Sequence, residues 1–251
     1  MGGNDRGRIF ALGLALALFV AAGSAVPPTR EIPPLPSADS LAQRIARRYG
    51  ADHFHLVNSL HYVFHVRYGG KDMARDWTWF PKSDSVVYKG KDAGGMEISA
   101  AYSRRNSYSM GAESVVAVDK MFVNDQYWLL FPLHLRWDIG KHMTVVSMTD
   151  PKEAARGEMY KLTVVYPPQG GYTPGDAYDL FVDNTATIQR WIFRKGNGEK
   201  TNRETLWSWP APVGGLAISM ERDTPKWVAD STAKGFRLWF TDVTVVPSTV
   251  P

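Results

Sequence analysis

The most hydrophobic internal segment of the chain, residues 122–138, reads FVNDQYWLLFPLHLRWD. Residues 127–131 are apolar without a break, and the apolar positions of residues 115–122 are compatible with a helix. A helix that is apolar on every side has to be enclosed by other elements. The pattern therefore predicts a buried central helix with the rest of the chain wrapped around it.

Pro132 marks the predicted end of this helix. The residue before a proline is disfavoured in helical geometry, so the helix is expected to stop at Phe131. Beyond the proline, Leu133, Leu135 and Trp137 alternate with polar residues. Alternation of this kind is typical of an extended segment, and it predicts an extended exit from the helix.

Much of the remaining chain has the two-residue period of β-strands. In residues 57–68, Tyr62, Phe64 and Val66 fall on one face, and His61 and His65 fall on the other. Short segments rich in Gly, Pro, Asn and Asp separate such runs and predict turns. The predicted strands are residues 57–68, 73–80, 85–89, 96–102, 143–148, 158–166, 177–183, 187–195, 204–209, 216–221 and 236–246.

One predicted hairpin joins residues 177–183 to residues 187–195. A loop between these strands would place Asp179 opposite Arg190 and Tyr178 opposite Trp191. Opposite charges then pair on one face, and the aromatic residues share the face expected to pack on the core.

A short amphipathic helix is predicted at residues 40–49. Ser37 or Asp39 is placed to cap its start, and Gly50 to end it. With about eleven strands and short turns, the predicted fold class is α+β. It is a curved antiparallel sheet, an unclosed β-barrel, around a buried central helix, with the short N-terminal helix beside it.

Residues 1–25 have the pattern of a secretory signal peptide. Arg6 and Arg8 precede an apolar stretch at residues 9–22, and small residues lead to predicted cleavage after Ala25. The alternative is an uncleaved N-terminal anchor. No second stretch is long and apolar enough to span a membrane, so the cleaved protein is expected to be soluble and periplasmic or secreted.

Residues 26–37 are rich in proline and form a predicted extended lead-in. Residues 38–246 contain no repeat or linker and are expected to form a single domain, which is ordinary for a chain of 251 residues. The chain has no cysteine. It therefore lacks the residue on which a bacterial lipoprotein is acylated.

Charge and motifs exclude several functions. The net charge is +4, and the sequence has no basic run of the kind that binds nucleic acid. His61 and His65 share a strand face but lie about 13 Å apart, too far to bind one metal ion. Nucleophile, metalloprotease, phosphate-loop and calcium motifs are all missing from the sequence. We therefore expect no enzymatic activity, no catalytic residue, no metal and no cofactor.

Aromatic residues are the remaining signal, with 9 Trp, 11 Tyr and 11 Phe. They either pack the core of a β protein or line a site for an apolar ligand. The residues predicted to line such a site are Trp77, Trp79, Tyr127, Trp128, Phe131 and Trp191. The Gly- and Pro-rich segment 167–176 contains Tyr172 and is either a rigid turn or a loop at the mouth of the cavity.

Several segments together resemble the periplasmic lipoprotein-carrier superfamily, the LolA-like proteins. The likeness is greatest to an uncharacterised branch called outer-membrane lipoprotein-sorting-protein-like, and it extends over residues 38–246. The segments that carry it are SLHY at 59–62 through WTW at 77–79, residues 122–137, GGYTPGDAYDL at 170–180, WIF at 191–193 and FRLWFTDV at 236–243. The resemblance implies an unclosed β-barrel over helices with an apolar cavity, which in the carriers holds acyl chains.

Three functions follow as hypotheses. The leading one is a soluble periplasmic carrier or binding protein for a lipid or a lipidated protein. The alternative is a cell-envelope module that binds or assembles other envelope proteins and has no ligand cavity. The third is a hydrolase acting on lipids, which would need a cleft with an activated nucleophile.

Overall fold

The computed structural model describes residues 34–91, 95–107, 113–148, 158–171, 173–228 and 235–248. The chain divides into two units, Met1–Pro34 and Leu35–Pro251, and every element described below belongs to the second. The predicted signal peptide, residues 26–33 of the lead-in and Tyr172 lie outside the described residues.

Eleven strands form one antiparallel sheet in the order β4-β3-β2-β1-β13-β12-β9-β8-β7-β6-β5. The outer strands β4 and β5 do not pair with each other, so the sheet stays open as predicted. The strands of the sheet are β1 Val57–Tyr68, β2 Lys71–Phe80, β3 Ser85–Lys91, β4 Glu97–Ser103, β5 His142–Ser147, β6 Met159–Val165, β7 Ala177–Asp183, β8 Ile188–Arg194, β9 Arg203–Trp207, β12 Glu221–Asp223 and β13 Arg237–Pro247.

The predicted strand at residues 216–221 is instead two strands. Its first part is β11, Leu216–Ile218, which pairs with the unpredicted strand β10, Ala211–Val213, in a separate two-stranded sheet. Its end begins β12 of the main sheet. The other predicted strands are present, and β1 and β7 have the predicted bounds.

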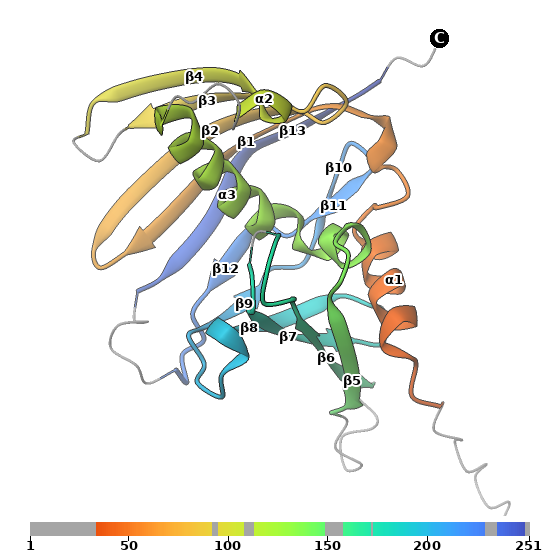
Figure 1. Ribbon diagram of the computed structural model, residues 1–251. Coiled ribbons are helices and arrows are strands. Elements are labelled where there is room, and N and C mark those ends of the chain that lie inside the picture. Colours follow the sequence, from red (N-terminus) through yellow and green to blue (C-terminus); the bar gives the residue numbers. More distant parts are fainter. Residues whose placement is uncertain are drawn as a thin grey trace, which may run out of the picture. The chain divides into compact units, whose positions relative to one another are not determined.

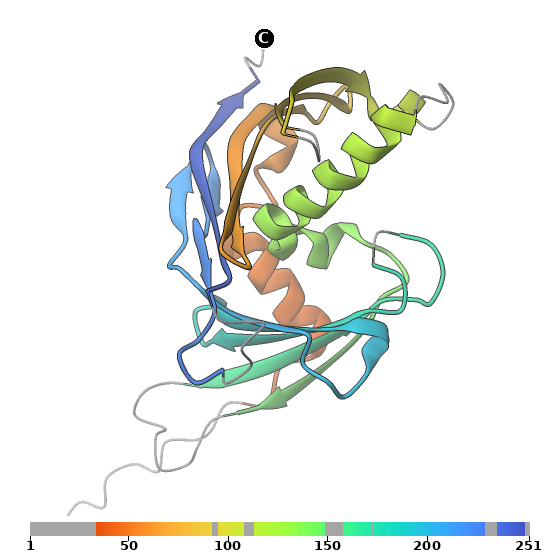
Figure 2. The same cartoon turned by 90° about the vertical axis from the view of Figure 1, so that its left-hand side faces the viewer.

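Two long helices, α1 Ala38–Arg48 and α3 Glu113–Trp137, lie within the curve of the sheet. Figure 1 shows α3 crossing the sheet, and Figure 2 shows it between the arm formed by β1–β4 and the arm formed by β5–β9. The shorter helical segments are α2 Arg104–Ser107, η1 Phe54–Leu56 and η3 Lys195–Asn197. This arrangement confirms the predicted class of a curved, unclosed sheet around a central helix.

Helix α1 begins two residues earlier than predicted, and its ends have clear local causes. The side chain of Ser37 accepts a hydrogen bond from the backbone N–H of Ser40 at 3.1 Å, so Ser37 is the cap. Gly50 has a φ of +93°, and a Cβ there would lie 2.6 Å from the carbonyl oxygen of Gly215. Only glycine fits this position, which fixes the end of the helix.

Helix α3 corrects the predicted stop at Phe131. It continues through Pro132 to Trp137, so the expected extended exit is helical. The cause is a kink at Leu130, whose φ and ψ of −114° and 16° are not helical. Pro132 therefore lies in the first turn of a second helical segment, a position where proline is tolerated.

The hairpin of β7 and β8 corrects the predicted pairs. Asp179 and Tyr178 each lie opposite the residue two positions beyond the one predicted. One position arises because Val182 pairs with Ile188 and not with Thr187, and the other because the register shifts between Phe181 and Val182. Two residues is the period of a strand, so Tyr178 and Trp191 still share the buried face, as predicted. Asp179 forms its ion pair with Arg194, at 2.9 Å, and not with Arg190.

Candidate ligand-binding cavity

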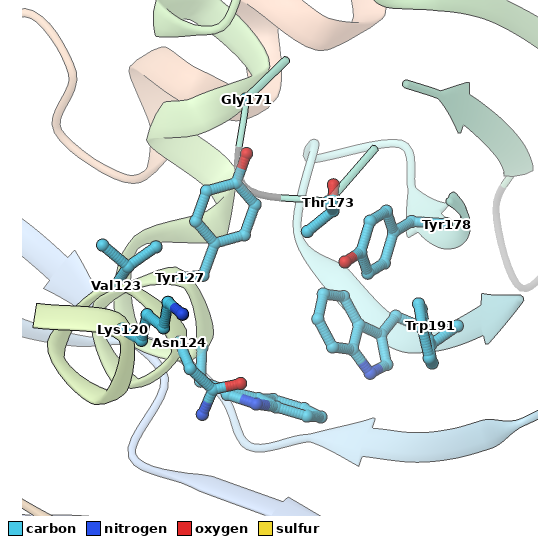
Figure 3. Close-up of a pocket in the computed structure, with 10 residues that line it drawn as sticks. Lys120, Val123, Asn124, Tyr127, Gly171, Thr173, Tyr178 and Trp191 are labelled. Atoms are coloured by element: carbon cyan, nitrogen blue, oxygen red, sulfur yellow. The ribbon is translucent and has the colours of Figure 1, made fainter. Parts of the chain in front are cut away.

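A cavity of about 460 Å³ lies between α3 and the strands β7 and β8. Figure 3 shows the helix on one side of this space and the strands on the other. The residues that α3 contributes recur at three- and four-residue intervals, so they share one face of the helix. They are Lys120, Val123, Asn124, Tyr127 and Trp128.

The opposite wall is a cluster of aromatic rings. Tyr178 comes from β7, and Trp191 and Phe193 come from β8. The ring of Tyr178 lies 5.0 Å from that of Trp191 and 5.4 Å from that of Phe193, between centroids. Trp128 reaches across from the helix to within 4.6 Å of Trp191 and closes the cavity on that side.

The cavity has an opening to solvent. Lys120, Asn124 and Gly171 belong to its lining and are exposed, whereas Trp191 and Tyr178 are buried in its wall. Gly171 and Thr173 come from the Gly- and Pro-rich segment between β6 and β7, so this loop borders the cavity.

A second depression of about 380 Å³ continues from the first. The two share three lining residues, Asn124, Trp128 and Phe193. The further lining residues of the second depression are Phe64, Val66, Arg75, Asn202, Arg203, Phe236 and Leu238. The combined lining is mostly apolar, and it lies between α3 and the concave face of the sheet.

Three of the six residues predicted to line a ligand site line this cavity, and the other three lie elsewhere. Tyr127, Trp128 and Trp191 line the cavity, and Trp79 lines a separate depression of about 170 Å³. Phe131 is fully buried behind the cavity wall, 5.0 Å from the ring of Trp191. The sixth, Trp77, is fully buried on the other side of α3. Contact of any of the six with a ligand stays a prediction.

Sequence reasoning did not select seven of the ten lining residues, although two of the seven, Gly171 and Thr173, lie in the segment considered as a loop at the cavity mouth. Lys120 and Asn124 lie on the same helix face as Tyr127, so helical spacing counted from Tyr127 could have found them. Tyr178 and Phe193 had been placed on the apolar face of their hairpin but not at a cavity. Strand alternation identifies a buried face, and it does not show where packing leaves space.

The other face of α3 packs on β2–β4 through buried ion pairs, beside two further depressions of about 710 and 170 Å³. Asp125 is fully buried and accepts two hydrogen bonds from Arg75, at 2.6 and 2.7 Å, and a third from the indole N–H of Trp77, at 2.9 Å. One and a half turns earlier, the buried carboxylate of Asp119 accepts a hydrogen bond from Arg104 at 2.8 Å. These contacts fix the helix against the sheet.

Arg222 contacts two residues next to the cavity wall, Trp207 and the backbone of Trp128. It is fully buried, and its guanidinium stacks 3.4 Å from the ring centroid of Trp207. Burial lowers the pKa of Arg222 to about 9. Its amino groups donate to the carbonyl oxygens of Ser219, at 2.8 Å, and Trp128, at 3.1 Å.

The carbonyl of Trp128 needs this donor because of the proline. In a regular helix it would accept a hydrogen bond from the N–H of residue 132, and Pro132 has none. Arg222 satisfies the carbonyl instead. The backbone of Trp128 is thereby anchored at the point where its ring forms the cavity wall.

Tyr127 is oriented by a carboxylate at the end of α3. The hydroxyls of Tyr127 and Tyr166 and Nδ1 of His134 all bond to Asp138, the last two at 2.8 and 2.9 Å. Burial acts to raise the pKa of Asp138, but the hydrogen bonds from His134 and the tyrosines outweigh it and hold the pKa below its usual value.

Within the described parts of the chain, no group of three or more His, Cys, Asp or Glu side chains is arranged to hold a metal ion. His61 instead bonds to Asp76 at 3.1 Å, and His65 stacks on Trp239. Over the same residues, no helix has the length and hydrophobicity needed to cross a membrane.

Comparison with solved structures finds distant similarity at low sequence identity. No protein-family model matches the chain, and no curated protein is similar to it in sequence. A DUF1329 family protein from Desulfovibrio piger ATCC 29098 is 10% identical, with a TM-score of 0.45 over 84% of this chain and 94% of that chain. MucB is 13% identical, with a TM-score of 0.27 over 74% of this chain and 66% of that chain.

Proposed function

We propose that the unit Leu35–Pro251 binds an acyl chain in the cavity between α3 and strands β7 and β8. The observation that carries this proposal is the aromatic-lined space of about 460 Å³. Its volume lies within the range of small-molecule binding sites, which are concave and mostly apolar with a few polar groups. Asn124, Thr173 and Lys120 supply the polar groups of this lining.

The hydrophobic effect is sufficient for such binding. Each CH₂ group that leaves water contributes about 0.8 kcal/mol. A sixteen-carbon chain that became fully buried would gain on the order of 10 kcal/mol before the cost of association. The shared lining of the two depressions offers a continuous path along which such a chain would extend.

The wider role is a carrier or binding protein for a lipid or lipidated protein in the cell envelope. Two features of the sequence support it: the signal-peptide pattern of residues 1–25 and the resemblance to LolA-like proteins. A module that only binds envelope proteins requires no cavity, so the cavity favours the carrier. We propose binding without catalysis, since the described residues that line the cavity include no Ser, Cys, His, Asp or Glu.

The test is to purify the full chain from a bacterial periplasm without detergent, then apply native mass spectrometry and lipid extraction. We expect a bound lipid or acylated peptide. Emptied protein is then titrated with N-phenyl-1-naphthylamine, a neutral apolar probe whose fluorescence rises in apolar surroundings. Val123→Phe, which fills the cavity, should weaken probe binding at least tenfold.

The matched control is Ala117→Phe, which adds the same side chain at an exposed position of α3. It should bind the probe like the unmodified protein. A folded protein that carries no lipid and binds no probe would disprove the proposal. Equal binding by both variants would place the site elsewhere.

A further inference from the structure

We propose that the ligand is an acyl chain with an anionic head group, and that the ammonium of Lys120 binds this head group at the cavity mouth. The inference rests on the proposed function, because it concerns the same site. It starts from the charges of the lining. Among the described residues that line the two depressions, the charged ones are Lys120, Arg75 and Arg203, and none is acidic.

The three cations differ in their availability. The guanidinium of Arg75 donates two hydrogen bonds to the carboxylate of Asp125. Arg203 covers aromatic rings, with its guanidinium 4.0 Å from the ring centroid of Phe236 and 5.4 Å from that of Tyr68. Lys120 is exposed, and its ammonium makes no ion pair or hydrogen bond with the residues that the structure describes.

Lys120 also has the right place on the helix. It is the lining residue of α3 nearest the start of the helix, and Asn124 and Trp128 follow at intervals of four on the same face. Figure 3 shows Lys120, Val123 and Asn124 together on the helix side of the space. A ligand with its chain along Trp128 and Trp191 would present its head group to Lys120.

The chemistry of this arrangement favours an anion over a neutral head group. A charge-assisted hydrogen bond from an ammonium to a carboxylate or phosphate is about twice as strong as a neutral one. The chain would supply most of the affinity, and the head group would set the orientation and the selectivity. Carboxylate and phosphate share the recognised chemistry, so the test has to separate them.

The test compares three ligands with the same twelve-carbon chain: dodecanoate, dodecyl phosphate and dodecanol. Each displaces N-phenyl-1-naphthylamine from the full-length protein at low ionic strength. We expect the two anions to bind roughly five- to tenfold more tightly than the alcohol, with the ranking of the anions naming the head group. Added salt should reduce this preference.

Three variants assign the preference to Lys120. Lys120→Gln should remove the preference while leaving dodecanol binding unchanged, and Lys120→Arg should retain it. Lys89→Gln is the matched control, because Lys89 is exposed on β3 and lines neither depression. It should behave like the unmodified protein.

The outcomes separate this inference from the function on which it rests. Equal affinity for all three ligands overturns the anionic head group and leaves acyl-chain binding intact. A preference that survives Lys120→Gln overturns the role of Lys120. Failure of every ligand to displace or bind overturns both proposals.

Discussion

The two faces of α3 meet the same sheet in different ways. Towards β2–β4, the helix packs on the fully buried Trp77, and the buried carboxylates of Asp119 and Asp125 bond to arginines of the opposite elements. Two further depressions, of about 710 and 170 Å³, lie beside these contacts. Towards β7 and β8, the helix presents Tyr127 and Trp128, and a cavity separates it from part of the sheet.

Aromatic content does not explain the difference, because both faces are rich in aromatic rings. The buried ion pairs distinguish the two faces, since each holds a carboxylate of α3 within hydrogen-bond distance of the element opposite. On the other face, Tyr127 and Trp128 meet the aromatic rings of β7 and β8 across the cavity.

The strongest test of this comparison is to remove a buried carboxylate. Asp125→Ala leaves Arg75 charged and nearly buried and the indole N–H of Trp77 without its acceptor, so we expect a loss of about 3–5 kcal/mol in the free energy of unfolding. Urea denaturation measures it. The control Asp72→Ala breaks the pair with Arg67, in which both side chains are about half exposed, and should cost far less.

A loss for Asp125→Ala no larger than that for Asp72→Ala would contradict the role given to the buried pairs. In that case, the packing of α3 on β2–β4 would depend on apolar contacts alone.

A second test concerns the link between Arg222 and the kink. Arg222→Met leaves the carbonyls of Trp128 and Ser219 without a donor, so we expect a loss of about 1–3 kcal/mol in urea denaturation. Pro132→Ala restores an N–H that is able to reach the Trp128 carbonyl. In that background, Arg222→Met should cost less, by about 1 kcal/mol.

This double-mutant cycle is its own control, because each variant is measured with and without the other. Additive losses, within about 0.5 kcal/mol, would show that Arg222 does not compensate for the missing N–H of Pro132.

The smallest expected effect concerns the carboxylate that orients Tyr127. The folded protein holds the pKa of Asp138 below its usual value, so Asp138 stabilises the fold above its unfolded pKa of about 3.9. This contribution is lost as the pH falls through the lower, folded pKa. Asp138→Asn should therefore cost about 1 kcal/mol at pH 6 and progressively less below about pH 4.

The measurement is the free energy of unfolding of both proteins between pH 6 and pH 3. A difference between them that stays constant over this range would rule out the lowered pKa as its source.

Residues and their neighbours in sequence were enough to predict most elements. The alternation in β1 predicted its bounds and its buried face, and the bounds of β7 were also predicted. Ser37, one of two candidate caps, and Gly50 mark the ends of α1, which begins two residues earlier than predicted. The errors arose at two backbone irregularities that the local sequence pattern does not show. The kink at Leu130 carries α3 past Pro132, and a shift of register beside a loop displaced the pairs of the β7–β8 hairpin.

The candidate site was also predicted only in part. Tyr127, Trp128 and Trp191 line the cavity, but Trp77 and Phe131 have the same composition and periodicity and are buried in solid packing. Lys120 gave no signal in the sequence, because a single lysine on a helix is ordinary. Its position matters only because the opposite wall is apolar.

The sequence alone determined the class of fold, the central helix and the apolar faces, since these depend on the local periods of strand and helix. The tertiary structure alone decided where the interior is filled and where it is hollow. That decision depends on contacts between distant residues, such as Arg75 with Asp125 and Arg222 with the carbonyl of Trp128. Such contacts join elements whose local patterns carry no information about one another.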